Sequence, residues 1–405
     1  MFEDRNAQYA LTQVLEAMLN DESLEKVYLI IDAINECDHQ IFQLLKRIVS
    51  DDSSARSKIK WLMTSRDPPF FMERSGIDTS LELNSEHVSG AVFRFIDHKV
   101  NTLAGQKDHD AELQDFTKEF LGGKAEGTFL WVALVCQELT EVDARKVKEI
   151  LEKIPAGLNE MYTRMLGQVV NLRDPRDAKL CQRILCAVMF TIRPLFLDEI
   201  PHFADLPKGD HNLRATNDLI NHCGSFVVVQ QGMVYLVHES AKEFLIVTKR
   251  MTTFDYEDAE ENIARRCLDM MSKELKRNIC HLKSSGPLEE NMASSAVDRF
   301  IPHHIQYACQ YWVYHFQAGY YCDPEPVYHF FRNHFLHWLE VLGFIKNASR
   351  ATLVLEILDN LAFVSIPEST LQGISPTQIR PGFMNMTNWF LLSMTQGNLF
   401  KSSVM

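Results

Sequence analysis

Two short apolar runs, each followed at once by polar side chains, dominate the hydrophobic pattern at the start of the chain. The runs are Val27–Ile31 and Ile59–Met63. Continuous apolar stretches of this length are typical of strands buried on both faces of a parallel sheet. Helical spacing at 7–20, a helix at 40–49 and a short strand at 79–83 complete an alternation that predicts a parallel α/β layer.

From Glu86 onward the apolar spacing becomes helical almost throughout. Paired glycines at Gly122-Gly123 and the Pro155–Gly157 segment interrupt the pattern, as residues that end helices do. The pattern predicts five helices before residue 173, at 86–103, 109–122, 128–140, 144–153 and 158–172.

The next segment combines three helices with a β-hairpin. Two β-branched runs within 226–237 turn at Gln231-Gly232, which is a hairpin signal. Three helices followed by a two-stranded wing describe a winged helix. The helices are predicted at 177–191, from Asp198-Glu199 onward, and near 213–222, with a further helix at 240–248.

The predicted fold class is therefore an α/β remnant, an incomplete parallel sheet of the P-loop type, followed by a mainly α-helical chain. We expect a partial α/β core, a helical domain, a winged-helix domain, a helical region rich in aromatic residues, and a poorly ordered tail. The predicted boundaries are 1–85, 86–172, 173–250, 251–362 and 363–405.

Composition narrows the partners and the compartment. The formal net charge is -13, which disfavours non-specific attraction to nucleic acid or to an anionic membrane. Nine scattered cysteines, most of them in apolar runs, indicate reduced and buried thiols. The first residues are too charged for a signal peptide, and no apolar run reaches membrane-spanning length. We expect a cytoplasmic protein whose partners are other proteins.

The acids after the first run have the spacing of a nucleotide-hydrolysing site. Asp32 ends the strand and Glu36 follows four positions later, so the first can hold Mg²⁺ and the second can polarise a water. Arg66 follows the second run and can reach a terminal phosphate. The alternative is structural: a strand ending in a polar turn, with Arg66 paired to Asp67 or Glu36.

A phosphate loop is missing from this pattern. Such a loop has the form G-x-x-x-x-G-K-[ST] and lies between a strand and a helix. The one Gly-Lys pair, Gly123-Lys124, is followed by Ala125 and lies between predicted helices. A βαβ unit takes about 30 residues or more, and the predicted helix already occupies the segment before Val27. We therefore expect an N-terminally truncated chain without the loop.

His238 lies where the predicted wing meets the next helix. It can bond a β-phosphate, or it can cap the helix or fill an interface, and the sequence leaves these alternatives open. Cys181 and Cys186 lack the spacing of metal ligands, so no metal site is predicted besides Asp32 with Mg²⁺. The third helix of the winged helix carries Arg214 as its one Lys or Arg, with Asp218 a turn away, which disfavours DNA binding.

Several motifs in series resemble those of fungal NACHT-domain STAND NTPases. These proteins are similar to NOD-like receptors and include heterokaryon-incompatibility proteins. Residues 30–37 resemble the Walker B motif, and residues 60–66 resemble the sensor-1 motif. Further similar segments are 127–134, 154–162, 223–226, 237–245, 307–313 and 334–340.

The resemblance implies an oligomerising switch gated by Mg-ATP or Mg-GTP. In it Asp32 would hold Mg²⁺, Glu36 would assist hydrolysis, Arg66 would sense the γ-phosphate and His238 would contact the bound diphosphate. Because the phosphate loop is missing, these roles are vestigial in the leading hypothesis, and no cofactor is expected. That hypothesis is a non-catalytic scaffold that binds other proteins, intact NACHT relatives among them. The alternatives are an active NTPase switch whose phosphate loop lies upstream of these residues, and a DNA-binding winged-helix regulator.

Overall fold

The computed structural model divides the chain into two compact units, Met1–Leu83 and Asn84–Met405, and each is described by itself. The predicted helix at 40–49, the predicted strand at 79–83, and Glu36 and Arg66 lie outside the described residues, as does the tail beyond Val364. The described residues are 13–15, 17, 18, 21, 23, 24, 26–32, 59–64, 85–107, 109–248, 258–282, 294–319 and 325–364.

The first unit contains a pair of parallel strands, β1 (Val27–Ile31) and β2 (Ile59–Met63). The pairing begins with Val27 opposite Ile59 and ends with Ile31 opposite Met63. Beyond it the backbone N–H of Thr64 still donates to the Ile31 carbonyl, at 2.9 Å. The two strands predicted from the apolar runs are confirmed, and so is their parallel direction.

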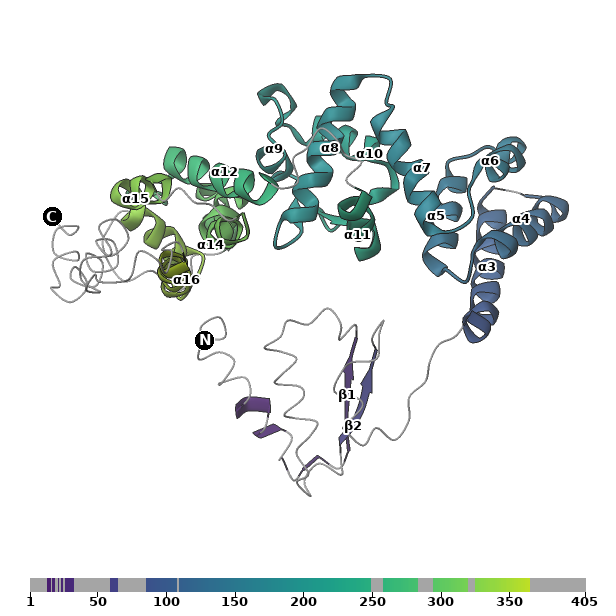
Figure 1. The fold of residues 1–405 in the computed structure, drawn as a ribbon, viewed down its shortest axis with the longest axis horizontal. Helices are drawn as coiled ribbons and strands as arrows, with labels where there is room; N and C mark the ends of the chain where they lie inside the picture. Colours follow the sequence, from purple (N-terminus) through teal and green to yellow (C-terminus); the bar gives the residue numbers. More distant parts are fainter. Residues whose placement is uncertain are drawn as a thin grey trace. The chain divides into compact units, whose positions relative to one another are not determined.

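The second unit begins with a helical region in which the predicted helices all form (Figure 1). The indole N–H of Trp131 on α5 donates to the carbonyl of Pro155 at 3.1 Å and so ties α5 to the loop between α6 and α7. The elements are α3 (Ser85–Lys107), α4 (Ala111–Lys124), α5 (Phe129–Thr140), η3 (Ala144–Lys146), α6 (Val147–Lys153) and α7 (Leu158–Val170).

The winged-helix region follows, with one strand more than the sequence predicted. Leu195–Phe196 forms β3, which pairs antiparallel with the second wing strand, so the sheet order is β3-β5-β4. The two-residue strand is too short for any alternation to reveal it. The other elements are α8 (Pro175–Phe190), α9 (Ile200–Phe203), η4 (Lys208–Asp210), α10 (Leu213–His222), η5 (Gly224–Phe226), β4 (Val227–Gln230), β5 (Met233–Leu236) and α11 (Glu239–Thr248).

The turn of the wing has the backbone that its sequence predicts. Gln231 and Gly232 have φ values of 52° and 79°. Two successive positive φ angles define the type I′ turn, whose twist matches that of the flanking strands. This turn fixes the register, with Gln230 opposite Met233.

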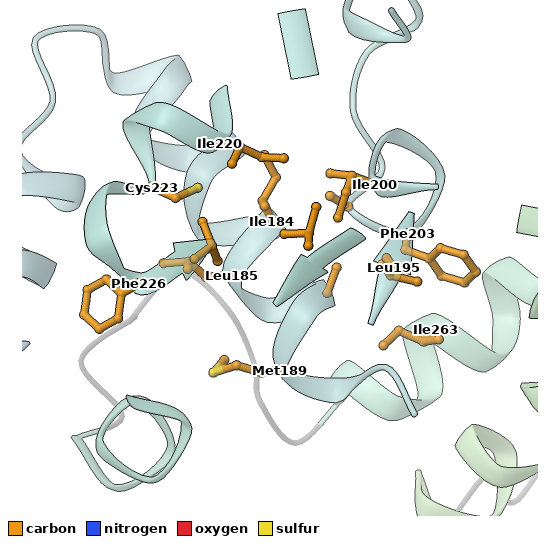
Figure 2. Close-up of a cluster of buried hydrophobic side chains, with 14 of the residues drawn as sticks. Ile184, Leu185, Met189, Leu195, Ile200, Phe203, Ile220, Cys223, Phe226 and Ile263 are labelled. Atoms are coloured by element: carbon orange, nitrogen blue, oxygen red, sulfur yellow. The ribbon is translucent and has the colours of Figure 1, made fainter. Parts of the chain in front are cut away.

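Side chains from the helices and strands of the winged-helix region converge on one core (Figure 2). Ile184, Leu195 and Phe226 are completely buried in it. Ile263 of α12 (Ala259–Glu274) belongs to the same buried cluster, so the core continues into the helices that follow. The winged helix and the C-terminal helices therefore share apolar packing.

The C-terminal region is helical and aromatic, as the sequence predicts. The indole N–H of Trp338 donates to the Cys309 carbonyl at 2.9 Å, which satisfies a polar group inside this packing. The helices after α12 are α13 (Ser294–Phe300), α14 (His303–Ala318), α15 (Glu325–Phe344) and α16 (Arg350–Val364). The predicted buried, unpaired thiols are confirmed at seven described cysteines: Cys136, Cys181, Cys186, Cys223, Cys267, Cys280 and Cys309.

Candidate functional site

Asp32 and Thr64 lie together at the carboxyl edge of the strand pair. Each residue directly follows its strand, and because the strands are parallel, both ends meet at one edge. The Thr64 hydroxyl donates to Oδ1 of Asp32, and both residues are exposed. A carboxylate and a hydroxyl at this edge are oxygen ligands of the kind that Mg²⁺ accepts. Of the predicted acidic site, this is the part that the structure describes.

The Gly123-Lys124 pair is committed to a structural role. It lies in the last turn of α4, where the Lys124 ammonium donates to the Ile154 carbonyl at 2.8 Å. The same Nζ lies 4.2 Å from the centroid of the Phe120 ring. A phosphate-binding lysine must instead extend from a turn between a strand and a helix. The pair therefore lacks the strand-to-helix turn of a phosphate loop.

His238 directly precedes α11, and its ring caps that helix. The backbone N–H of Ser240 donates to Nδ1 of His238 at 3.1 Å, which satisfies one of the free N–H groups at the helix start. A backbone N–H can only donate, so Nδ1 accepts and the neutral ring carries its proton on Nε2. His238 is exposed, which leaves an outward-facing N–H donor. His238 therefore caps the helix, as one of the predicted alternatives has it, and its Nε2 can still make a second contact.

The position of His238 depends on a side chain from the preceding helical region. The Ser240 hydroxyl lies 2.8 Å from Nδ1 of His238 and 3.0 Å from the hydroxyl of Tyr162 on α7. Tyr162 packs between Phe226 and Phe244, with ring centroids 5.8 Å and 5.3 Å away. Burial raises the pKa of its phenol, while the Ser240 bond lowers it. A chain of hydroxyls thus ties the His238 ring to α7.

The sequence-based prediction missed Tyr162 and Ser240. A local signal existed for Ser240, because it lies two positions after His238 at the start of a predicted helix and so within reach of that ring. Tyr162 is distant in sequence and its role follows from packing alone. The acidic edge and His238 belong to different units, and the structure describes each separately.

A shallow cavity of about 240 Å³ adjoins His238, between the end of α8, the wing and α11. Two cations line it, and each already has a carboxylate. Arg193 donates to Glu199 through both terminal nitrogens at 2.8 Å, and Lys242 lies 3.9 Å from Glu239. Paired cations attract an anion weakly, so this cavity offers the His238 N–H little support for holding a phosphate.

DNA binding, metal binding and membrane crossing each require particular features of the residues described. Arg214 is exposed on α10 with Asp218 also exposed one turn on, so that helix presents no cluster of cations to a DNA backbone. Among the residues that the structure describes, no three His, Cys, Asp or Glu side chains are grouped as metal ligands. Within the same residues, no helix has the length and apolarity needed to cross a membrane.

Two parts of the chain match family models of known proteins. Residues 168–257 match a family model described as the winged helix domain of GPI inositol-deacylase. Residues 1–66 match one described as the N-terminal part of nephrocystin 3. The first match supports the winged-helix architecture built above from α8 to α11.

The chain is similar over most of its length to the vegetative incompatibility protein HET-E-1 of Podospora anserina. The two are 32% identical over 393 residues, which cover 89% of this chain. The same alignment covers 28% of HET-E-1, so the chain spans less than a third of the length of this relative. No solved structure matches the chain significantly. These findings support a NACHT-like relative of fungal incompatibility proteins.

Proposed function

We propose that this chain is part of a NACHT-type signalling protein that acts through contacts with other proteins, and that these 405 residues bind no nucleotide by themselves. The similarity to HET-E-1, the serial order of the motifs and the winged-helix region support the signalling class. The observation that supports the absence of nucleotide binding is the position of Lys124. Its ammonium is held by the Ile154 carbonyl and the Phe120 ring inside the helical region.

The residues present could bind only part of a nucleotide and its Mg²⁺ ion. Asp32 with Thr64 can hold Mg²⁺ through its oxygens, and His238 offers one N–H donor. A triphosphate also needs a cradle of backbone N–H groups and a lysine, which supply most of its binding energy. We propose that Asp32, Glu36, Arg66 and His238 are vestigial in the isolated chain.

Binding of a fluorescent ATP analogue in the presence of Mg²⁺ tests this proposal on the purified 405-residue protein. We expect no saturable binding at micromolar concentrations, and the same result with a GTP analogue. Asp32→Ala should leave the signal unchanged, and Asp258→Ala is a matched control outside the site. Saturable binding that Asp32→Ala abolishes and Asp258→Ala preserves would refute the proposal.

A second candidate is an oligomerising switch that hydrolyses ATP or GTP, with its phosphate loop supplied by sequence outside these residues. The juxtaposition of Asp32 and Thr64 favours it, since parallel strands deliver ligands for Mg²⁺ at this edge. In that switch Glu36 would assist hydrolysis and Arg66 would contact the γ-phosphate. A longer protein, extended by any in-frame G-x-x-x-x-G-K-[ST] segment from the genomic sequence, would then bind nucleotide in an Asp32-dependent manner.

We propose protein partners and a cytoplasmic location for both candidate functions, the non-catalytic protein and the NTPase switch. Intact NACHT relatives are the partners we would test first, because a chain that keeps the helical and winged-helix regions can dock where those regions dock. Co-purification of the tagged 405-residue chain with such a relative, with and without nucleotide, measures this. An isolated chain that captures neither form would contradict the docking role.

A further inference from the structure

Two histidine rings stack where the winged-helix region meets the C-terminal helices. The ring of His202 on α9 lies parallel to that of His304 on α14, with centroids 3.6 Å apart and an interplanar angle of 8°. The edge of a third ring, His211, faces His202 at 5.0 Å and 70°. His304 is 8% exposed and His202 is half-buried. The rings therefore form part of the packed junction and are not a surface coincidence.

Charged groups surround this stack unevenly. Nε2 of His304 lies 3.0 Å from Oε1 of Glu274, so a positive charge on His304 has a carboxylate beside it. A positive charge on His202 instead faces one imidazole across the stack and another at its edge. The titratable side chains that act on His202 are His304, His211, Glu274 and Asp198, and Asp205, Arg266 and His303 belong to ion pairs beside them.

Some of these neighbours favour the junction when protonated. His303 lies 3.0 Å from Asp198, and a protonated ring strengthens that pair. Nε2 of His211 lies 2.8 Å from the Leu206 carbonyl, which fixes its edge toward the stack. Arg266 donates to the Phe203 carbonyl at 2.5 Å and stays charged at every relevant pH. The group whose protonation opposes the junction is thus His202.

We propose that the His202–His304 stack is an acid-sensitive latch, which holds the winged-helix region against the C-terminal helices near neutral pH and loosens as the pH falls. Neutral imidazoles stack favourably, and one charge is accommodated beside Glu274. A second charge, on His202, places two cations face to face in a partly dehydrated junction. The latch is released when separating α9 from α14 relieves that repulsion and rehydrates both rings.

The direction of the pH dependence follows from proton linkage. Burial, with the nearby His304 and His211, lowers the pKa of His202 from 6.5 to about 4 in the closed junction. An open junction returns the ring to its ordinary pKa, so the open form takes up an extra proton between these values. Closure is fully favoured above pH 6.5 and weakens below it. The linkage amounts to about a 30-fold shift toward opening by pH 5.

This inference goes beyond the proposed function, since it requires neither nucleotide nor a partner. It concerns the junction between the winged-helix region and the C-terminal helices. A signalling switch needs an element with two arrangements, and this junction supplies one whose balance is set by a proton.

Distances between spin labels in the full 405-residue chain test the latch. Labels on encoded non-natural residues at Lys179 of α8 and Arg332 of α15, both exposed, leave the cysteines untouched. The wild-type chain should give one short distance at pH 7.5 and a growing longer population at pH 5. Far-UV circular dichroism at both pH values separates opening from unfolding, because opening retains the helices.

Three variants make the test specific. His202→Phe keeps a flat ring on His304 that cannot be charged, so it should stay closed at pH 5. His222→Phe, at an exposed histidine on α10 outside the stack, should open like the wild type. Glu274→Gln keeps a side-chain amide beside His304 but removes a carboxylate that raises the pKa of His202 in the closed junction, so it should open at least as far as the wild type at pH 5.

The outcomes are decisive in both directions. An unchanged wild-type distance at pH 5, or opening of His202→Phe alongside the wild type, would overturn the latch. If His202→Phe is already open at pH 7.5, Glu274→Gln decides: less opening than the wild type at pH 5 also overturns the latch.

Discussion

The winged-helix region contacts α7 on one side and the C-terminal helices on the other, and the two junctions differ in the side chains that form them. Toward α7 the contact is mainly aromatic, with Tyr162 packed between Phe226 and Phe244 and a single hydroxyl pair to Ser240. Toward the C-terminal helices the contact adds a dense polar network to its apolar core. That network contains Arg193, Glu199, Tyr307, His315, Glu260 and the stacked histidines.

The difference bears on which junction can respond to its surroundings. Apolar burial is non-directional and does not depend on protonation. A buried polar network stabilises only while every group is satisfied, and it fails when one proton or partner changes. The α7 junction should therefore behave as a fixed joint, and the C-terminal junction as a conditional one. Substitutions on the two sides can break or sharpen this contrast.

The largest effect is expected at Glu199, which has no exposed surface. Its carboxylate accepts two bonds from Arg193 at 2.8 Å and one from the Phe196 backbone N–H at 2.7 Å. Glu199→Ala leaves that partly buried cation without its carboxylate, which should cost about 3 kcal/mol or more. Amide hydrogen exchange in the full chain, read on peptides of α9 and α14, measures the loss.

The control for Glu199 is an ion pair of similar length on the surface. Arg176 and Asp210 lie 3.0 Å apart, with the arginine largely exposed. Asp210→Ala should cost less than about 1 kcal/mol, because water screens and replaces the pair. Equal costs for Glu199→Ala and Asp210→Ala would show that the C-terminal junction gains nothing from its buried network.

Local elements of this fold were predictable from the sequence, and the junctions were not. The strand pair, the helices from 85 to 248 and the Gln231-Gly232 turn each follow from a period or a turn signal that spans a few residues. The strand Leu195–Phe196 is too short to carry a period, and it forms because β5 offers an unpaired edge.

The candidate site divides in the same way. Asp32 could be placed at a strand end from the apolar run before it, and Thr64 beside it follows from parallel pairing. The cap by His238 is one of three roles that the sequence leaves open, and recognising it required the Ser240 contact. The stack of His202 on His304 joins helices far apart in the chain, and no local pattern indicates it.

The intermediate effect is expected for removal of one hydroxyl at the conditional junction. The Tyr307 hydroxyl accepts from the Ile192 backbone N–H and bonds Nε2 of His315, both at 2.8 Å. Burial raises the pKa of this phenol, so it stays neutral. Tyr307→Phe keeps the ring but leaves two polar partners unsatisfied, at a cost of about 2 kcal/mol. The readout is exchange of the α14 amides in the full-length chain.

The same exchange experiment should show that His315 matters through Tyr307. Nδ1 of His315 lies 2.5 Å from Glu260, so the ring keeps that contact in Tyr307→Phe. Glu260→Gln combined with Tyr307→Phe should cost a different amount from the sum of the two single variants, because both act on one ring. Strict additivity would mean that the network is a set of independent bonds.

The smallest effect is expected from the same change, tyrosine to phenylalanine, at the junction with α7. Tyr162→Phe removes the bond to Ser240 but retains the stacking on Phe226 and Phe244. Ser240 keeps His238 as a partner, so no buried group is left unsatisfied and the cost should be about 1 kcal/mol or less. Exchange of the α7 and α11 amides at pH 7.5 measures it. If Tyr162→Phe cost as much as Tyr307→Phe, the two junctions would be equivalent. The conditional character would then belong to the whole winged-helix region, because only a difference between the two hydroxyls can assign it to one side.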